Sequence, residues 1–221
     1  MAGTQQFIGA MDLAARGVRT IGIPATIDKD IACSHYAIGF DTACNTSIEC
    51  IDKLSDTMQS HERCSIVEVM GRNAGHLALY VGIAVGAAAV LVPEKPLDIK
   101  GVVEGIRKFR IQGRRHFIII VAEGCSRATD LSRQIKEETG MDPRVTILGH
   151  IQRGGRPNAR DRVVASRMGV YAIDILAEGR YNRVVSIING EMRDFDIKEA
   201  LTMKKDLQET MYRTAVTLTK A

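Results

Sequence analysis

Two carboxylates and a hydroxyl lie close together in residues 24–30, which read PATIDKD. Thr26, Asp28 and Asp30 follow a short apolar run, so we expect them just after the end of a strand. A carboxylate in that position could act as a general base toward a substrate hydroxyl, and its neighbour could face a metal ion. The same residue types also suit a turn that caps the next helix, and this segment taken alone favours the turn.

A glycine-rich segment with one arginine follows the next apolar run, at residues 70–75 (MGRNAG). Gly71 and Gly75 would let the main chain approach a ligand closely, and Arg72 would supply a charge for a phosphate group. A glycine turn with a solvated arginine explains the same residues equally well.

The densest polar segment is residues 149–156, which read GHIQRGGR. Two adjacent glycines, His150 and two arginines have the composition of an anion-binding loop, and a basic surface turn is the alternative. Glu123 adds one carboxylate after the apolar run 116–122. Carboxylates and phosphate-binding groups after successive strands favour phosphoryl transfer to a sugar phosphate over hydride or acyl chemistry.

Short apolar runs alternate with helical periodicity along almost the whole chain. The runs predict strands at residues 20–23, 65–69, 89–92, 116–122, 145–148 and 184–188. Runs this apolar are typical of strands that are covered on both faces, as in parallel sheets. Helices are predicted after a possible N-cap at Asp98, over 163–176 with Gly179 at the end, and over 207–218. The pattern predicts an α/β fold, with mostly parallel sheets and helices on both faces.

The composition is that of a globular protein. The 221 residues are 45% hydrophobic and 25% charged, and 30 basic against 26 acidic residues give a net charge of +4. This charge is too small to argue for nucleic-acid binding without a clustered patch. The apolar run 77–93 is shorter than the ~20 residues of a spanning helix, and it reads as a buried helix followed by a buried strand. We therefore expect a soluble cytoplasmic protein with no membrane or nucleic-acid partner. Five scattered cysteines without a CxxC pair disfavour a zinc cluster and a disulfide scaffold.

Several longer strings resemble the bacterial type of ATP-dependent 6-phosphofructokinase, in order and at matching spacing. They are PATIDKDI, IGFDTACNT, SHERCSIVEVMGRNAGHLAL, VAEG and RVTILGHIQRGGRPNARDRVVASRMG. The resemblance extends over essentially the whole chain. It implies phosphorylation of the 1-hydroxyl of fructose 6-phosphate in glycolysis, with ATP as co-substrate and Mg²⁺ as cofactor.

The resemblance also implies roles for individual residues. Asp28 is similar to the general base on the sugar hydroxyl, Thr26 to the residue that orients the reacting groups, and Asp30 to one near the metal and phosphates. Arg72 is similar to the arginine that stabilises the transferring phosphoryl group. The remaining matches bind substrate: Met70, Gly71 and Glu123 along the sugar, His150 and Arg153 at the 6-phosphate, and Arg63 and Arg144 reaching a neighbouring subunit's site.

Shared sites of this kind imply a homo-oligomer, typically a tetramer. The resemblance predicts a two-lobed fold, with residues 1–39 and 152–202 as the remnant of a nucleotide-binding lobe. Residues 40–151 and 203–221 would form the sugar-phosphate lobe. The family's ATP-binding loops and its GGDGS metal-binding stretch have no counterpart in this sequence. We therefore expect an incomplete nucleotide lobe from N-terminal truncation, and no phosphoryl transfer by the chain alone.

Some positions depart from the family pattern. Ala25 and Lys29 stand where members usually have glycine and asparagine, and pyrophosphate-dependent relatives usually carry lysine at the first position, so ATP is the favoured donor. Ser55 and Ala88 stand where effector-regulated members have arginine and glutamate. The alternative function is a catalytically inactive fragment that binds the sugar phosphate without the ATP half. Nucleic-acid binding through the arginine-rich loops is disfavoured, because those arginines coincide with the sugar-phosphate ligands.

Overall fold

The computed structural model describes residues 3–58, 64–114 and 116–219, and it divides the chain into two compact units. The first unit consists of Met1–Thr42 with Arg156–Asp206, and the second of Ala43–Gly155 with Leu207–Ala221. The boundaries between the two predicted lobes were at residues 39/40, 151/152 and 202/203. The boundaries between the two units are at 42/43, 155/156 and 206/207. That the first unit binds nucleotide and the second binds sugar phosphate stays a prediction.

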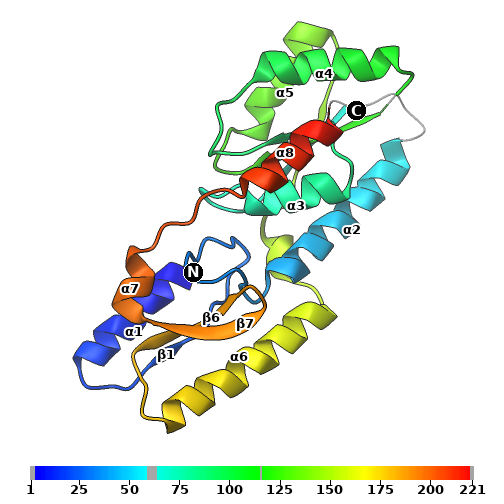
Figure 1. The fold of residues 1–221 in the computed structure, drawn as a ribbon. Helices are drawn as coiled ribbons and strands as arrows, with labels where there is room; N and C mark the ends of the chain where they lie inside the picture. Colours follow the sequence, from blue (N-terminus) through cyan, green and yellow to red (C-terminus); the bar gives the residue numbers. More distant parts are fainter. Residues whose placement is uncertain (1–2, 59–63, 115, 220–221) are drawn as a thin grey trace. The chain divides into compact units, whose positions relative to one another are not determined.

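The first unit is built on a three-stranded sheet of order β1-β6-β7 (Figure 1). Its elements are α1 (Gly3–Ala15), β1 (Ile21–Gly22), α6 (Ala159–Ala177), β6 (Arg183–Ile188), β7 (Glu191–Asp196) and α7 (Ile197–Thr202). β1 runs parallel to β6, whereas β7 pairs with β6 antiparallel. One face of α6 packs Met168 and Ile175 against the sheet. Helix α2 (Phe40–Met58) begins in this unit and continues into the second.

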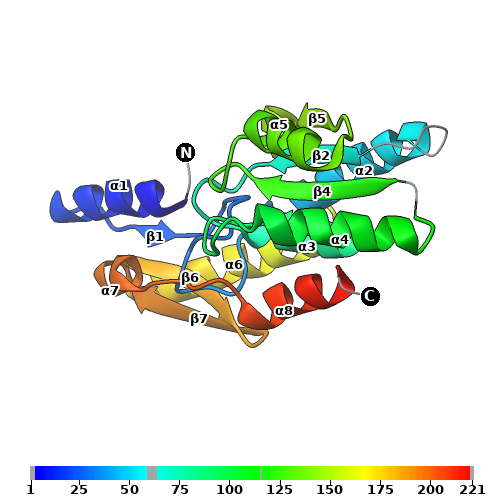
Figure 2. The ribbon, with the colours of Figure 1, turned by 90° about the horizontal axis from the view of Figure 1, so that it is seen from above.

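The second unit is built on a four-stranded parallel sheet of order β3-β4-β2-β5, whose strands β2 and β4 lie side by side in Figure 2. Its elements are β2 (Cys64–Val69), α3 (His76–Ala84), β3 (Ala89–Leu91), α4 (Ile99–Ile111), β4 (Phe117–Ala122), α5 (Ala128–Thr139), β5 (Arg144–Ile147), the 3₁₀-helix η1 (Gly149–Arg153) and α8 (Glu209–Leu218). All strands point the same way, so their carboxyl ends share one edge of the sheet.

The core of the second unit explains why its strands are so apolar. Ile119 and Val121 of β4 belong to a cluster with Ile106 of α4 and Leu131 of α5. Ile120, between them, is equally inaccessible to solvent and points to the opposite face, where α3 contacts β4. The sheet is therefore covered on both faces, as the apolar runs predicted.

The predicted α/β fold is confirmed, with small differences at the element ends. All the predicted strands are present, although β1 is limited to Ile21–Gly22. Residues 77–93 divide into a buried helix and a strand as expected, and among the described residues no helix is long and apolar enough to cross a membrane. Asp98 caps α4, because its carboxylate accepts a hydrogen bond from the Gly101 amide.

The antiparallel strand β7 was not predicted from the sequence. Its residues, EMRDFD, are too polar to form an apolar run. The signal that could have revealed it is Asn189-Gly190, because both residues have positive φ angles (52° and 85°) and connect Ile188 to its partner Glu191. An Asn-Gly pair of this kind is the preferred two-residue turn of a β-hairpin.

Candidate functional site

Most of the predicted substrate-binding residues in the second unit follow the carboxyl ends of three adjacent strands. Met70, Gly71 and Arg72 come after β2, Glu123 comes after β4, and η1 comes after β5. Because β4, β2 and β5 are neighbours in a parallel sheet, these segments meet at one edge. The structure therefore brings together loops that lie far apart in the sequence.

The loops after β2 and β4 are connected through main-chain groups. The Arg72 amide donates a hydrogen bond of 2.6 Å to Oε1 of Glu123, whose own amide donates to the Val69 carbonyl at 2.9 Å. A Cβ atom at position 124 would overlap the Arg72 carbonyl oxygen, so this approach requires Gly124. Arg72 itself has a φ of 54°, an uncommon conformation for arginine. Glu123 thus positions the main chain that carries Arg72.

Gln152 connects the loop after β2 to η1, and the sequence analysis did not identify it. Its side chain is only 1% exposed. Oε1 accepts hydrogen bonds from the Met70 amide (3.1 Å) and from the Ser47 hydroxyl of α2 (3.2 Å), and Nε2 donates to the Gly149 carbonyl (3.0 Å). The only available signal was its place between His150 and Arg153. Gln152 therefore acts as a positioning residue for both loops.

His150 and Arg153 lie three residues apart in η1, and both are exposed. A 3₁₀-helix has three residues per turn, so side chains at this spacing are stacked on one face. The turn is closed by the Gly154 amide, which donates to the Ile151 carbonyl at 3.1 Å. The two side chains can therefore approach the same anion from one direction.

Arg144 does not join this cluster within its own chain. It begins β5 and pairs in register with Ser65 near the start of β2, whereas His150 follows the other end of β5. A strand of this length spans about 10 Å. Arg63 lies outside the described residues, as does the rest of the SHER string.

The predicted catalytic loop lies in the first unit, after β1. The Asp28 amide donates a hydrogen bond of 3.1 Å to the Thr26 hydroxyl, and both side chains are buried. Lys29 has a φ of 55°, and its ammonium lies 4.5 Å from the centre of the Phe40 ring. Asparagine adopts positive φ more easily than lysine does, which gives a physical reason for the family's usual residue at this position.

The Asp30 carboxylate offers an oxygen ligand for a metal. Its Oδ1 is shielded from solvent and has no hydrogen-bond partner among the described residues. No group of three or more metal-ligating side chains exists in the part of the chain that the structure describes. Mg²⁺ is commonly held by one or two carboxylates together with water and substrate phosphates, so a single carboxylate of this kind fits the ion.

Lys205 supports the segment that follows Asp30, and it too was missed. Its ammonium donates hydrogen bonds to the carbonyls of Ile31 (2.9 Å) and Ser34 (2.7 Å). Burial, and after it the charge of Lys29, lower the pKa of Lys205 to about 8, although Asp30 acts in the opposite sense. The ammonium thus stabilises this turn of main chain, although burial at this position disfavours the charged form of the lysine.

Comparisons with known proteins agree on one family. A family model described as "Phosphofructokinase" matches residues 1–176. The ATP-dependent 6-phosphofructokinase of Brevibacillus brevis is 49% identical over 218 residues, which are 99% of this chain and 68% of the relative. The ATP-dependent 6-phosphofructokinase 1 of Clostridium perfringens is 49% identical over 220 residues, covering 100% of this chain and 69% of the relative.

Solved structures show the same fold. Phosphofructokinase from Saccharomyces cerevisiae superposes with a TM-score of 0.82 at 29% identity, over 91% of this chain and 28% of that one. The Pichia pastoris phosphofructokinase in the T-state gives a TM-score of 0.89 at 21% identity, over 98% of this chain and 30% of that one. The chain thus spans about two thirds of the bacterial relatives and less than a third of the yeast chains.

Proposed function

Because the chain belongs to the phosphofructokinase family, a family of transferases, we propose that it serves the transfer of a phosphoryl group from ATP to the 1-hydroxyl of fructose 6-phosphate. The observation that carries this proposal is the 49% identity to ATP-dependent 6-phosphofructokinases over 99% of the chain. The product would be fructose 1,6-bisphosphate, formed in glycolysis in the cytoplasm.

His150 and Arg153 bind the 6-phosphate in this proposal. Their exposure and their shared face on η1 support the assignment, because a phosphate accepts charge-assisted hydrogen bonds from both side chains at once. Met70, Gly71 and Glu123 line the sugar. The 2.6 Å bond between Glu123 and the Arg72 amide keeps this segment of main chain in place.

Asp28 is the proposed general base on the 1-hydroxyl, and Thr26 orients the reacting groups. The hydrogen bond between the Asp28 amide and the Thr26 hydroxyl supports their joint action, since it fixes the Thr26 side chain against the main chain that carries Asp28. Arg72 stabilises the charge on the transferring phosphoryl group. Such transfer depends mainly on positioning and on charge neutralisation.

Asp30 would hold Mg²⁺ together with water and the phosphates of ATP. The ion, when bound, neutralises charge on the phosphates and thereby favours attack by the sugar hydroxyl. The buried, unpartnered Oδ1 of Asp30 supports this role.

Arg63 and Arg144 are proposed to reach the site of a neighbouring subunit in a homotetramer. The position of Arg144 at the amino end of β5, away from its own chain's His150, supports this division.

A second candidate function is binding of fructose 6-phosphate without phosphoryl transfer. It is favoured by one observation, namely that the second unit by itself brings Glu123 and η1 together at one edge of its sheet. Here the second unit would keep its sugar-phosphate loops while the transfer itself does not occur.

One pair of measurements distinguishes the two functions. Calorimetric titration of the purified chain with fructose 6-phosphate and with fructose measures binding, and a coupled assay with ATP and Mg²⁺ measures transfer. Turnover that falls by at least ~10²-fold in Asp28→Asn supports the kinase, because a positioned base contributes that much. Binding of fructose 6-phosphate without turnover supports the second candidate, and absence of both contradicts both.

The phosphate contact has its own matched control. Arg153→Ala should weaken binding of fructose 6-phosphate more than binding of fructose, because the lost contact is specific to the phosphate. Arg110→Ala removes an exposed arginine of α4, a helix that carries none of the proposed substrate-binding residues, and it should leave both affinities unchanged. Equal losses for the two sugars in Arg153→Ala would indicate a packing role instead.

A further inference from the structure

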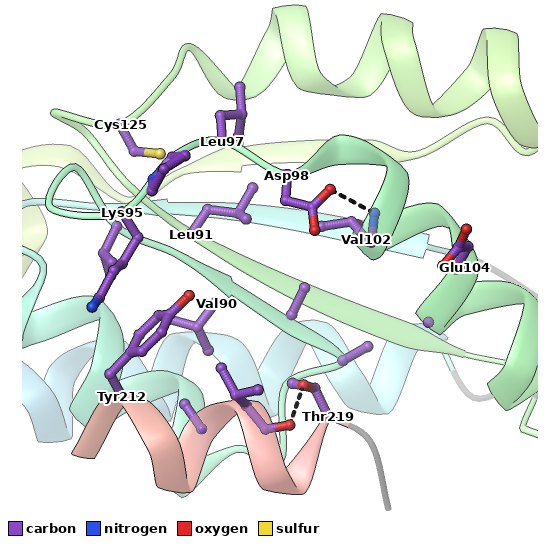
Figure 3. A pocket seen from close by; sticks show the side chains of 18 of the residues that line it. Val90, Leu91, Lys95, Leu97, Asp98, Val102, Glu104, Cys125, Tyr212 and Thr219 are labelled. Carbon is purple, nitrogen blue, oxygen red and sulfur yellow. Dashed lines mark hydrogen bonds between the residues drawn. The ribbon is translucent and has the colours of Figure 1, made fainter. Parts of the chain in front are cut away.

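A groove of about 470 Å³ lies in the second unit (Figure 3). Its walls are α4 and α8, and its floor is the edge strand β3, so we call it the α4–α8 groove. None of the described residues assigned to the sugar-phosphate site lines it. Its volume is within the range of small-molecule sites.

The groove exists because α4 carries glycines on the side that faces it. Gly101 and Gly105 are four residues apart and both line the groove. Gly101 is required by close packing, since a Cβ there would overlap the capping carboxylate of Asp98. Gly105 is different, because a Cβ at that position would meet no atom within 4 Å. The space beside Gly105 is therefore open, and a larger side chain could have filled it.

The lining of the groove combines aliphatic surface with four charged side chains, two of each sign, which are Lys95, Lys108, Asp98 and Glu104. Val90, Leu91 and Val102 contribute aliphatic surface. Lys95 forms an ion pair with Glu209 at 2.8 Å and lies 4.8 Å from the centre of the Tyr212 ring. No arginine lines the groove within the described part of the chain. An anion would thus meet Asp98 and Glu104 as well as the two lysines, and at Lys95 it would have to displace an ion pair, whereas an uncharged ligand would face neither cost.

Two features would hold such a ligand. The Tyr212 ring, which Figure 3 shows beside Lys95 toward one end of the groove, offers a surface for an aromatic ring. The strand edge offers hydrogen bonds. The Ala88 amide donates to Ile118 of β4, so the main-chain groups of Ala89 and Leu91 point to the side of β3 without a strand neighbour.

We propose that the α4–α8 groove binds an uncharged, largely aromatic small molecule of two or three rings, against Tyr212 and along the edge of β3. This site is separate from the proposed phosphoryl transfer and does not depend on it.

A matched pair of fluorescent probes tests both the place and the chemistry. N-Phenyl-1-naphthylamine is uncharged, and 1-anilinonaphthalene-8-sulfonate has the same rings with one negative charge. Titration of the full chain with the uncharged probe should show one saturable site. The sulfonate should bind at least about tenfold more weakly. Equal or tighter binding of the sulfonate would overturn the assignment to an uncharged ligand.

Gly105→Leu fills the open space and should weaken binding of the uncharged probe by at least about tenfold. Gly9→Leu is the matched control, because Gly9 lies in α1 of the other unit and a Cβ there would likewise meet no atom within 4 Å. Unchanged binding in Gly105→Leu overturns the proposal. Should this variant fail to fold, as judged by circular dichroism, Tyr212→Ala replaces it with the same expected loss.

The exposed apolar side chains of α6 provide a competing explanation that the experiment also resolves. Ile173 is 66% exposed and could bind the probe on the surface of the first unit. Binding that is lost in Ile173→Glu and retained in Gly105→Leu would place the probe on α6 and overturn the proposal. Binding lost in Gly105→Leu and retained in Ile173→Glu supports it.

Discussion

Replacing Gln152 with leucine should loosen two substrate loops at once. Leucine has a similar size but forms none of the hydrogen bonds that Gln152 makes with Met70, Ser47 and Gly149. The amide of Met70 and the carbonyl of Gly149 then lose their side-chain partner next to the core. Each polar group left without a partner costs about 1–3 kcal/mol, so we expect the two groups together to lower the free energy of unfolding by about 2–6 kcal/mol.

Urea unfolding followed by far-UV circular dichroism measures this loss. Gln112→Leu is the matched control, because Gln112 is exposed at the end of α4 and its replacement should change the free energy by less than about 0.5 kcal/mol. Gln152→Glu keeps the acceptors for Met70 and Ser47 but buries a carboxylate that faces the Gly149 carbonyl, so it should lose at least as much as Gln152→Leu. If Gln152→Leu unfolds at the same urea concentration as Gln112→Leu, the network does not hold the loops.

Three further predictions concern other parts of the chain. The pKa of Lys205 is about 8 in the folded chain against an ordinary 10.5, so this group releases a proton on folding and should make the free energy of unfolding rise with pH from about 8 to 9, before the buried thiols of Cys33 and Cys64 act in the opposite sense. Urea unfolding of Lys205→Met should lack this rise. Val170 and Ile173 are 63% and 66% exposed on α6, and replacing both with glutamate should reduce self-association in analytical ultracentrifugation. Gly124→Ala should lower the free energy of unfolding by about 1–3 kcal/mol, because the added methyl group overlaps the Arg72 carbonyl.

The parts of the fold that could be predicted are those in which one local pattern decides the structure. The strands β2 and β4 are buried on both faces, so almost every residue in them is apolar and the run can be recognised in the sequence. The cap at Asp98 depends on an amide three residues away and is also local. β7 has no such pattern, because its residues are polar and are held in place by antiparallel pairing with β6. The Asn-Gly turn was its only local signal in the sequence.

The candidate site was predictable where residues follow strand ends, and it was not where a side chain acts through distant partners. Gln152 bonds to residues 82 and 105 positions away, and Lys205 bonds to Ile31, 174 positions away. A glutamine or lysine in a polar loop is most often solvated, and only the fold decides whether it turns inward. The sequence therefore shows that these residues are present, but not whether their side chains point into the protein or into solvent.

The geometry of η1 explains why Gln152 is buried while its neighbours are exposed. Residues in a 3₁₀-helix advance by about 120° each, so His150 and Arg153 share a face and Gln152 points away from it. The face that carries Gln152 turns inward and is fixed by Met70 and Ser47, while the face about 120° away presents His150 and Arg153 to solvent. A one-residue shift would bury a cation and expose the glutamine. The same short turn thus anchors the loop and orients two side chains that can each donate a hydrogen bond in one direction.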